Sequence, residues 1–105
     1  MCNFNILVQN NHGYIVYCPG CRIFQLAYGT TLTRLQTNDF SLLRQYVATE
    51  CSYRNESGHC ITKNITVPID EATMFCLTNS ELFKLDQLLA EAAAVFDTYR
   101  ILEEV

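Results

Sequence analysis

The sequence predicts an α+β domain in which two helices pack on an antiparallel sheet, in the order β-β-β-β-α-β-β-α. Segments rich in β-branched and aromatic residues alternate with turn residues in the first third of the chain, and the pattern returns after position 60. Two other stretches carry apolar residues at helical spacing. The chain has 105 residues, 50% of them hydrophobic, which fits a single domain over residues 1–105 with one modest core.

Four strands are expected before the first helix. The residues Asn10-Asn11-His12-Gly13 form a turn between the first two strands, and Gly29 turns the third strand into the fourth. In the third strand, Phe24, Leu26 and Tyr28 share one face because side chains alternate along a strand. The expected strands cover residues 2–8, 14–17, 22–28 and 30–35.

The second half predicts a helix, a hairpin and a longer helix. Asn38 is expected to cap the first helix, with Asp39 in its first turn. Its buried face would consist of Phe40, Leu43, Val47 and Cys51. After a loop at 54–59, strands at 61–67 and 73–77 flank a turn containing Asp70 and Glu71, and Thr78-Asn79-Ser80-Glu81 starts a helix that runs to about residue 102.

The charge distribution argues against a nucleic-acid partner. Residues 61–105 carry three cations and eight acids, whereas residues 1–60 carry four arginines and three acids. Nucleic-acid binding depends on clustered Lys and Arg, and the chain has no basic run. The apolar stretches are too short for a membrane span, and residues 1–5 do not resemble a secretory signal. We therefore expect a cytoplasmic protein with reduced cysteines.

The tetrapeptide Cys18-Pro19-Gly20-Cys21, between two predicted strands, has the spacing of half a zinc knuckle. Two thiolates at this spacing can hold one metal ion, and Pro and Gly suit the tight turn between them. The second half of such a site, another Cys-x-x-Cys or a His pair, is missing from the sequence. The motif therefore predicts a structural zinc site but no reaction.

Pairing of the first two strands suggests a third ligand. In a hairpin centred on Asn11 and His12, paired residue numbers sum to about 23, which places Cys2 opposite Cys21. His12 would lie about 20 Å from the knuckle, at the other end of the hairpin. The fourth ligand stays open between Cys60, His59, Cys51 and Cys76. We rank His59 and Cys60 first because they lie at a loop–strand junction, whereas Cys51 and Cys76 suit buried apolar positions.

A dithiol redox role for Cys18 and Cys21 is the alternative. In thioredoxin-like chemistry, the first cysteine lies at a helix N-terminus, which lowers its pKa. The segment after Cys21 reads as a strand, so this helix is missing, and Arg22 alone is a weak substitute. No catalytic or cofactor-binding residues are predicted, since Ser57, His59 and Cys60 are neighbours in one loop rather than a triad assembled by the fold.

A longer stretch resembles a known family. The knuckle is followed by Phe24-Gln25-Leu26-Ala27-Tyr28-Gly29-Thr30-Thr31 and then by Asp39-Phe40-Ser41-Leu42-Leu43. This arrangement resembles a small uncharacterised family of bacterial domain proteins with a Cys-x-x-Cys unit and a QLAFGTT-like strand. The resemblance covers about the first half of the chain and implies no activity.

The last helix predicts self-association. Its main apolar face must pack on the sheet, and a second, narrower stripe lies on the opposite side. That stripe consists of Phe83, Ala90, Ala94 and Ile101. Small residues between bulky ends suit the approach of another helix, so we expect a homodimer through this helix. The sequence thus predicts a small binding or interaction protein with a structural zinc site and a protein or small-molecule partner that it does not identify.

Overall fold

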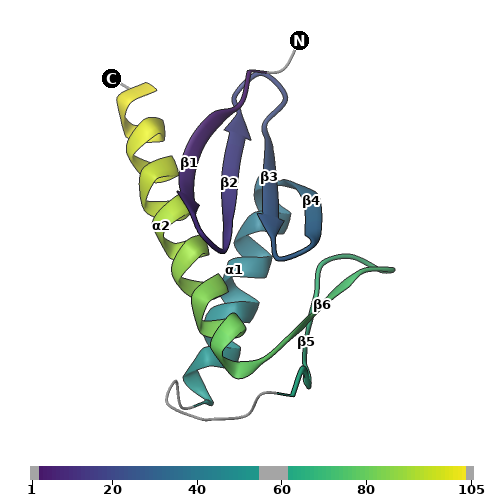
Figure 1. The fold of residues 1–105 in the computed structure, drawn as a ribbon. Helices are drawn as coiled ribbons and strands as arrows, with labels where there is room; N and C mark the ends of the chain where they lie inside the picture. The colour runs from purple at the N-terminus through teal and green to yellow at the C-terminus, as the bar shows by residue number, and fades with distance from the viewer. Residues whose placement is uncertain (1–2, 55–61, 104–105) are drawn as a thin grey trace.

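The computed structural model describes residues 3–54 and 62–103, and its elements follow the predicted order (Figure 1). The α+β prediction is therefore confirmed. The elements are β1 (Asn5–Asn10), β2 (Gly13–Cys18), β3 (Ile23–Tyr28), β4 (Thr31–Gln36), α1 (Thr37–Ser52), β5 (Ile65–Pro68), β6 (Met74–Leu77) and α2 (Asn79–Glu103).

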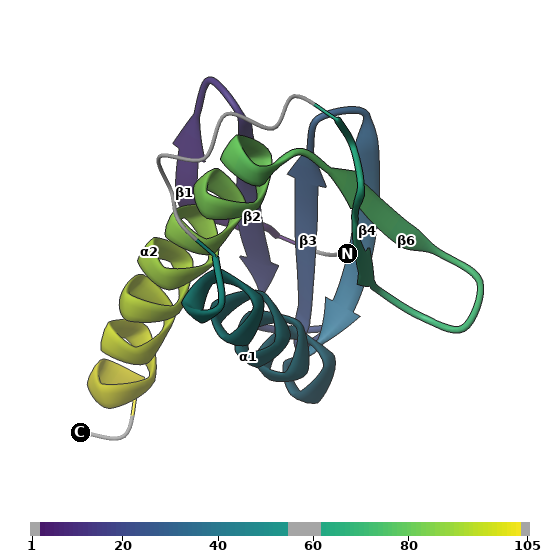
Figure 2. The same ribbon diagram turned by 90° about the horizontal axis from the view of Figure 1, so that it is seen from below.

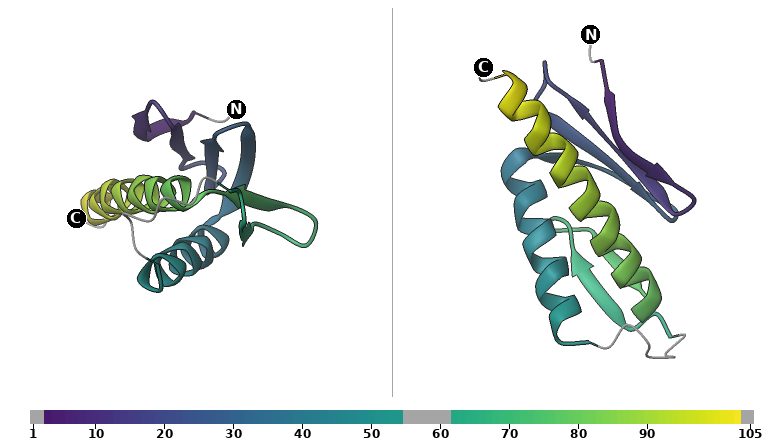
Figure 3. Two further views of the ribbon diagram at one scale, coloured as in Figure 1. Left: turned by 60° about the horizontal axis from the view of Figure 1, so that its bottom comes forward. Right: turned by 90° about the vertical axis from the view of Figure 1, so that its left-hand side faces the viewer.

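The domain has two layers and an added hairpin. Strands β1 to β4 form an antiparallel sheet in sequence order, while β5 and β6 pair with each other in a second, two-stranded sheet. Both helices lie on the same face of the four-stranded sheet (Figures 2 and 3). The hairpin continues the fold beyond β4, and its residues Ile65, Val67, Phe75 and Leu77 are buried in the same core.

The two faces of the large sheet differ as the alternation predicts. Phe24, Leu26 and Tyr28 of β3 are buried under the helices. The opposite face carries a hydrogen-bonded polar row that crosses three strands. In this row Arg34 Nε donates to Gln25 Oε1 at 3.2 Å, and Gln25 Nε2 donates to the Tyr14 hydroxyl at 3.2 Å.

The register of the first hairpin changes along its length. The predicted sum of 23 is correct from Asn10↔Gly13 to Val8↔Ile15. An irregularity between Ile6 and Val8 then shifts the pairing by one, so that Asn5 lies opposite Tyr17. A bulge of this kind bends an edge strand and re-aims its side chains. The predicted pairing of Cys2 lies outside the described residues.

The two helices begin in different ways. The predicted cap at Asn38 is wrong because β4 runs directly into α1, so that Gln36 occupies the N-cap position and makes no side-chain capping bond. The start of α2 is a capping box, as the sequence indicated. Here the Glu81 backbone N–H donates to Thr78 Oγ1 at 3.2 Å, and the Thr78 N–H donates to Glu81 Oε1 at 2.9 Å.

An aromatic cluster joins the sheet to both helices. The Phe24 ring stacks on Phe40 of α1 with centroids 4.1 Å apart, and it meets Phe96 of α2 edge-on at 4.9 Å. Tyr17 of β2 contacts Phe24 at 4.7 Å and Phe96 at 4.8 Å. Each such pair adds about 0.5–1.5 kcal/mol to the stabilisation that comes from burial alone. The cluster therefore fixes the position of both helices at this end of the sheet.

Tyr28 makes a second tie between the sheet and α2. Its hydroxyl donates to the Glu81 backbone carbonyl at 2.6 Å, and its ring packs edge-on against Phe75 at 6.1 Å. Burial, and secondarily the negative charge of Glu81, raise the pKa of Tyr28 to about 12. The start of α2 is thus held by the sheet as well as by its own capping box.

The close approach of β2 and β3 depends on glycine at position 13. A Cβ there would lie 2.0 Å from the Ala27 carbonyl oxygen, whereas at Gly20 the nearest atom is Cys18 Sγ at 3.9 Å. We expect Gly13→Ala to lower the free energy of unfolding by about 1–3 kcal/mol or more, because backbone must move to make room. Urea denaturation measures the loss, with Gly20→Ala as the matched control. Equal unfolding midpoints for the two variants would contradict the strand packing described here.

The capping box predicts a pH-dependent contribution to stability. Its hydrogen bond from the Thr78 backbone, assisted by Lys63, lowers the pKa of Glu81 despite some burial. A lowered pKa in the folded state stabilises the protein above the ordinary value of 4.5, and the contribution is lost as the pH falls through the lowered pKa. Glu81→Gln should therefore cost about 0.5–1 kcal/mol at neutral pH and progressively less at acid pH.

The measurement is chemical denaturation at several pH values, with Glu91→Gln on the exposed side of α2 as the control. A difference between wild type and Glu81→Gln that stays constant down to pH values of about 3 would show that the Glu81 charge does not act through the cap.

Candidate functional site

The cysteine knuckle forms the tight turn that its sequence predicts. The Arg22 backbone N–H donates to the Cys18 carbonyl at 2.7 Å and closes the turn between β2 and β3. Arg22 has a φ of 57°, which makes it the one non-glycine residue with positive φ in the described part of the chain. Such a backbone costs a residue with a Cβ about 1–2 kcal/mol. The turn therefore holds Arg22 in a strained conformation.

Of the predicted metal ligands, Cys18 and Cys21 of the knuckle lie in the described residues. Cys18 is a buried free thiol, 1% exposed. Cys21 is exposed and disulfide-bonded, and because Cys18 is free, this bond does not join the two cysteines of the knuckle. Cys2, His59 and Cys60 lie outside the described residues. Within residues 3–54 and 62–103, no three His, Cys, Asp or Glu side chains are grouped so that they could hold a metal ion.

The other two candidate cysteines lie apart from the knuckle. Cys51 is buried on α1 as predicted, with its Sγ 3.9 Å from the Leu82 carbonyl. The expectation that Cys76 is buried is wrong. Cys76 lies on the exposed side of β6, where its thiol donates to the Lys63 carbonyl at 3.1 Å. The four-residue strand β6 alternates, so Phe75 and Leu77 take the buried positions instead.

A cleft lies beside the knuckle, where four parts of the chain meet. We call it the arginine cleft, and its volume is about 600 Å³. Tyr17 of the sheet and Phe96 of α2 form its aromatic floor, and the knuckle, the start of α1 and the last turns of α2 surround this floor. Its lining residues are Asn5, Leu7, Tyr17, Pro19, Arg22, Thr37, Phe96, Tyr99 and Arg100.

The two arginines give the cleft its charge. Among the described residues, Arg22 and Arg100 line it and no acidic side chain does. Neither guanidinium forms a salt bridge or hydrogen bond with another side chain of the described residues; Arg100 instead lies 5.8 Å from the centre of the Phe96 ring. Such a cation–π contact orients the guanidinium without neutralising it.

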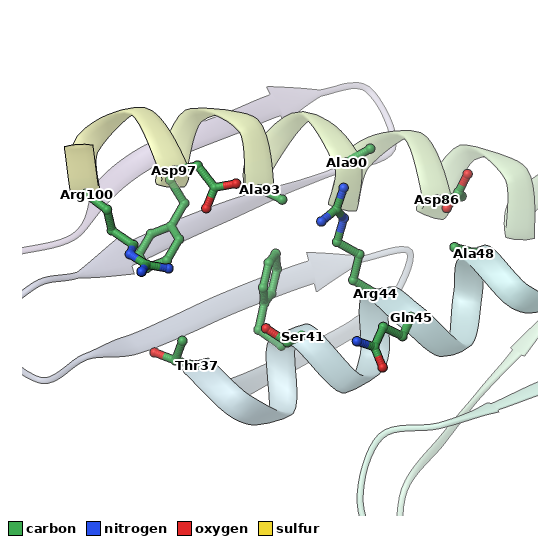
Figure 4. A pocket seen from close by; sticks show the side chains of 12 residues that line it. Thr37, Ser41, Arg44, Gln45, Ala48, Asp86, Ala90, Ala93, Asp97 and Arg100 are labelled. Atoms are coloured by element: carbon green, nitrogen blue, oxygen red, sulfur yellow. The ribbon is translucent and has the colours of Figure 1, made fainter. Parts of the chain in front are cut away.

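A second groove adjoins the cleft and has a different charge. It lies between α1 and α2, has a volume of about 450 Å³ and shares Thr37, Phe96 and Arg100 with the arginine cleft. Figure 4 shows Arg44 on α1 reaching toward α2, with the carboxylates of Asp86 and Asp97 on either side along α2. Arg100, which lines both spaces, extends from α2 toward the start of α1 (Figure 4). The acids therefore belong to the groove.

Patterns in the sequence do not predict this cleft. From the sequence, Arg22 stands out only as a neighbour of Cys21. The residues that line the cleft are spread from Asn5 to Arg100 and are joined by packing, not by a spacing in the sequence. One signal was available, because Arg22 directly follows a tight turn and is held close to whatever packs against that turn.

The fold and the cleft define a small α+β domain with a helical layer on one side of a meander and a positively charged cleft at one end. The chain belongs to the family of unknown function DUF6686, whose model matches residues 1–103. The match covers nearly the whole chain and assigns no activity. No curated protein and no solved structure matches it. In the described part of the chain, neither helix has the length and apolar character that crossing a membrane requires.

Proposed function

We propose that this protein is a small binding module and that the arginine cleft is its binding site. One observation carries the proposal: the cleft combines a volume in the range of small-molecule sites with three aromatic side chains and two guanidiniums that form no ion pair within the described residues. Apolar walls with a few polar groups that fix orientation are typical of such sites.

The packing around the cleft supports the proposal. Tyr17 and Phe96 line it and also belong to the aromatic cluster with Phe24 and Phe40. Their rings are held from behind by the core, so the floor is preformed. A preformed floor reduces the entropy that is lost when a ligand binds.

A steric block tests this function. Asn5 is an exposed residue of β1 that lines the cleft, and tryptophan is well tolerated in an edge strand. We expect a set of small planar fragments to shift the NMR signals of residues 17–22, 37 and 96–100 in the wild type. Asn5→Trp should abolish those shifts because the indole fills the space.

Gln9→Trp is the matched control, because Gln9 is exposed on the same strand and does not line the cleft. It should leave fragment binding unchanged. Fragment-induced shifts that fall elsewhere on the protein, or that persist in Asn5→Trp, would contradict the placement of the site.

We propose in addition that the reduced protein binds zinc through the knuckle. The hydrogen bond from Arg22 N to the Cys18 carbonyl keeps Cys18 and Cys21 on one tight turn, which supports the idea. A sulfur in a disulfide is not a thiolate ligand, so zinc requires reduction at Cys21. A structural zinc ion would stiffen the turn that carries Arg22; Cys2 and Cys60 remain the sequence-based candidates for further ligands.

Metal analysis of the reduced protein tests the zinc proposal. We expect one equivalent of zinc, lost in Cys18→Ala and retained in Cys51→Ala, whose cysteine lies on α1 away from the knuckle. Zinc bound equally by both variants, or by neither the variants nor the reduced wild type, would overturn it.

Two earlier expectations take second place to the cleft. For a dithiol redox role, the structure gives less support, because the segment after Cys21 is strand β3 and Cys18 is buried. A homodimer through α2 stays a separate proposal, which light scattering would test. Ala90, Ala94 and Ile101 are exposed, but Phe83 is half-buried against the core, so the available stripe is narrower than the sequence suggested.

A further inference from the structure

The charge of the arginine cleft is opposite to that of the protein. The chain has a net charge of −4, yet among the described residues the charged side chains that line the cleft are Arg22 and Arg100. Two acids of the described residues lie elsewhere: Asp97 lines the groove between the helices, and Asp39 lines a pocket with Pro68 and Ile69. The cleft is therefore a local positive region on an acidic domain.

The strain at Arg22 also indicates a role for its side chain. At a φ of 57°, glycine or asparagine would serve the turn better than arginine, whose guanidinium forms no ion pair within residues 3–54 and 62–103. Strained backbone positions of this kind concentrate at functional sites. The turn does not need the guanidinium, so the strain points to a use for it in the cleft that Arg22 lines.

We propose that the arginine cleft binds a small molecule that carries a carboxylate or a phosphate on a planar apolar body. This inference rests on the proposed function and adds the chemical class of the ligand. The oxyanion lies between the guanidiniums of Arg22 and Arg100, each of which can donate paired hydrogen bonds. The planar part lies against Tyr17, Phe96 and Tyr99.

The start of α1 adds to the same field. Thr37, the first residue of the helix, lines the cleft, and no side chain caps this N-terminus. The positive end of the helix dipole therefore contributes to the potential in the cleft, as a supplement to the two arginines. The acids elsewhere on the surface disfavour a polyanion, because a long chain of phosphates would have to pass over them. A small ligand with a single oxyanion fits both the positive potential in the cleft and the acidic surface elsewhere.

Binding measurements with matched probes test the charge. Benzoate and benzamide have the same planar shape and differ in charge, so their comparison tests the charge. Benzoate against phenyl phosphate compares the two oxyanions, and phenyl phosphate against inorganic phosphate tests the contribution of the ring. We expect the wild type to bind benzoate or phenyl phosphate at least about tenfold more tightly than benzamide, the size of one charge-assisted hydrogen bond. Inorganic phosphate should bind more weakly than phenyl phosphate because it lacks the ring.

Variants assign the effect to the two residues. Arg22→Gln and Arg100→Gln should each lower the affinity for the anionic probes about tenfold and leave benzamide unaffected. Arg34→Gln is the matched control, since Arg34 is an exposed arginine on the opposite face of the sheet. Arg22→Gly supplies a second readout: it should raise the melting temperature, because glycine accepts the positive φ, while it weakens anion binding.

The outcomes separate the two proposals. If benzamide binds in the cleft as tightly as benzoate and the arginine variants bind both alike, the inference about the anion is wrong and the binding site stands. If none of the four probes binds to the cleft, both proposals fail. Loss of anion binding in Arg34→Gln as well would show a nonspecific charge effect and would also overturn the inference.

Discussion

The contact on which the rest of this structure depends is the packing of Phe24 between the two helices. Phe24 is fully buried, stacks on Phe40, meets Phe96 edge-on and packs against the tilted ring of Tyr17. One side chain of the central strand β3 thus sets the positions of β2, α1 and α2 at one end of the sheet. Because interiors are packed as closely as crystals, these positions cannot adjust independently. Phe24 pairs with Tyr17 on one side and Leu35 on the other, so the same contact also places the knuckle that follows Tyr17 and the start of α1 that follows β4.

The cleft follows from this packing. The rings of Tyr17 and Phe96 each pack on one side against Phe24, and the surface of these rings that Phe24 does not cover forms the floor of the cleft. The bulge in β1 brings Asn5 opposite Tyr17, which places the edge strand at the rim. Arg22 and Arg100 then come from elements that are far apart in sequence. The charge of the cleft is therefore a product of tertiary structure, although the chain as a whole is acidic.

Local patterns predicted the fold well and the site poorly. Alternation along β3 and helical spacing in α1 identified the buried faces, and the Thr78–Glu81 capping box marked the start of α2. The start of α1 was misplaced because β4 leads into it without a loop. Cys76 was misplaced because a four-residue strand gives too short a pattern to fix its face. No spacing of residues in the sequence marks the cleft, because the knuckle, the start of α1, the end of α2 and the bulged strand β1 come together only after folding.

A crystal structure of the protein with 4-bromobenzoate tests the central claim most directly. Bromine gives an anomalous difference peak that marks the substituted end of the ring even where the density of the rest of the ligand is weak. The account predicts one strong bromine peak in the arginine cleft, with the ring against Tyr17, Phe96 and Tyr99 and the carboxylate directed at Arg22 and Arg100. A bromine peak in the groove between α1 and α2, or on the opposite face of the sheet near Arg34, with an empty arginine cleft, would contradict it.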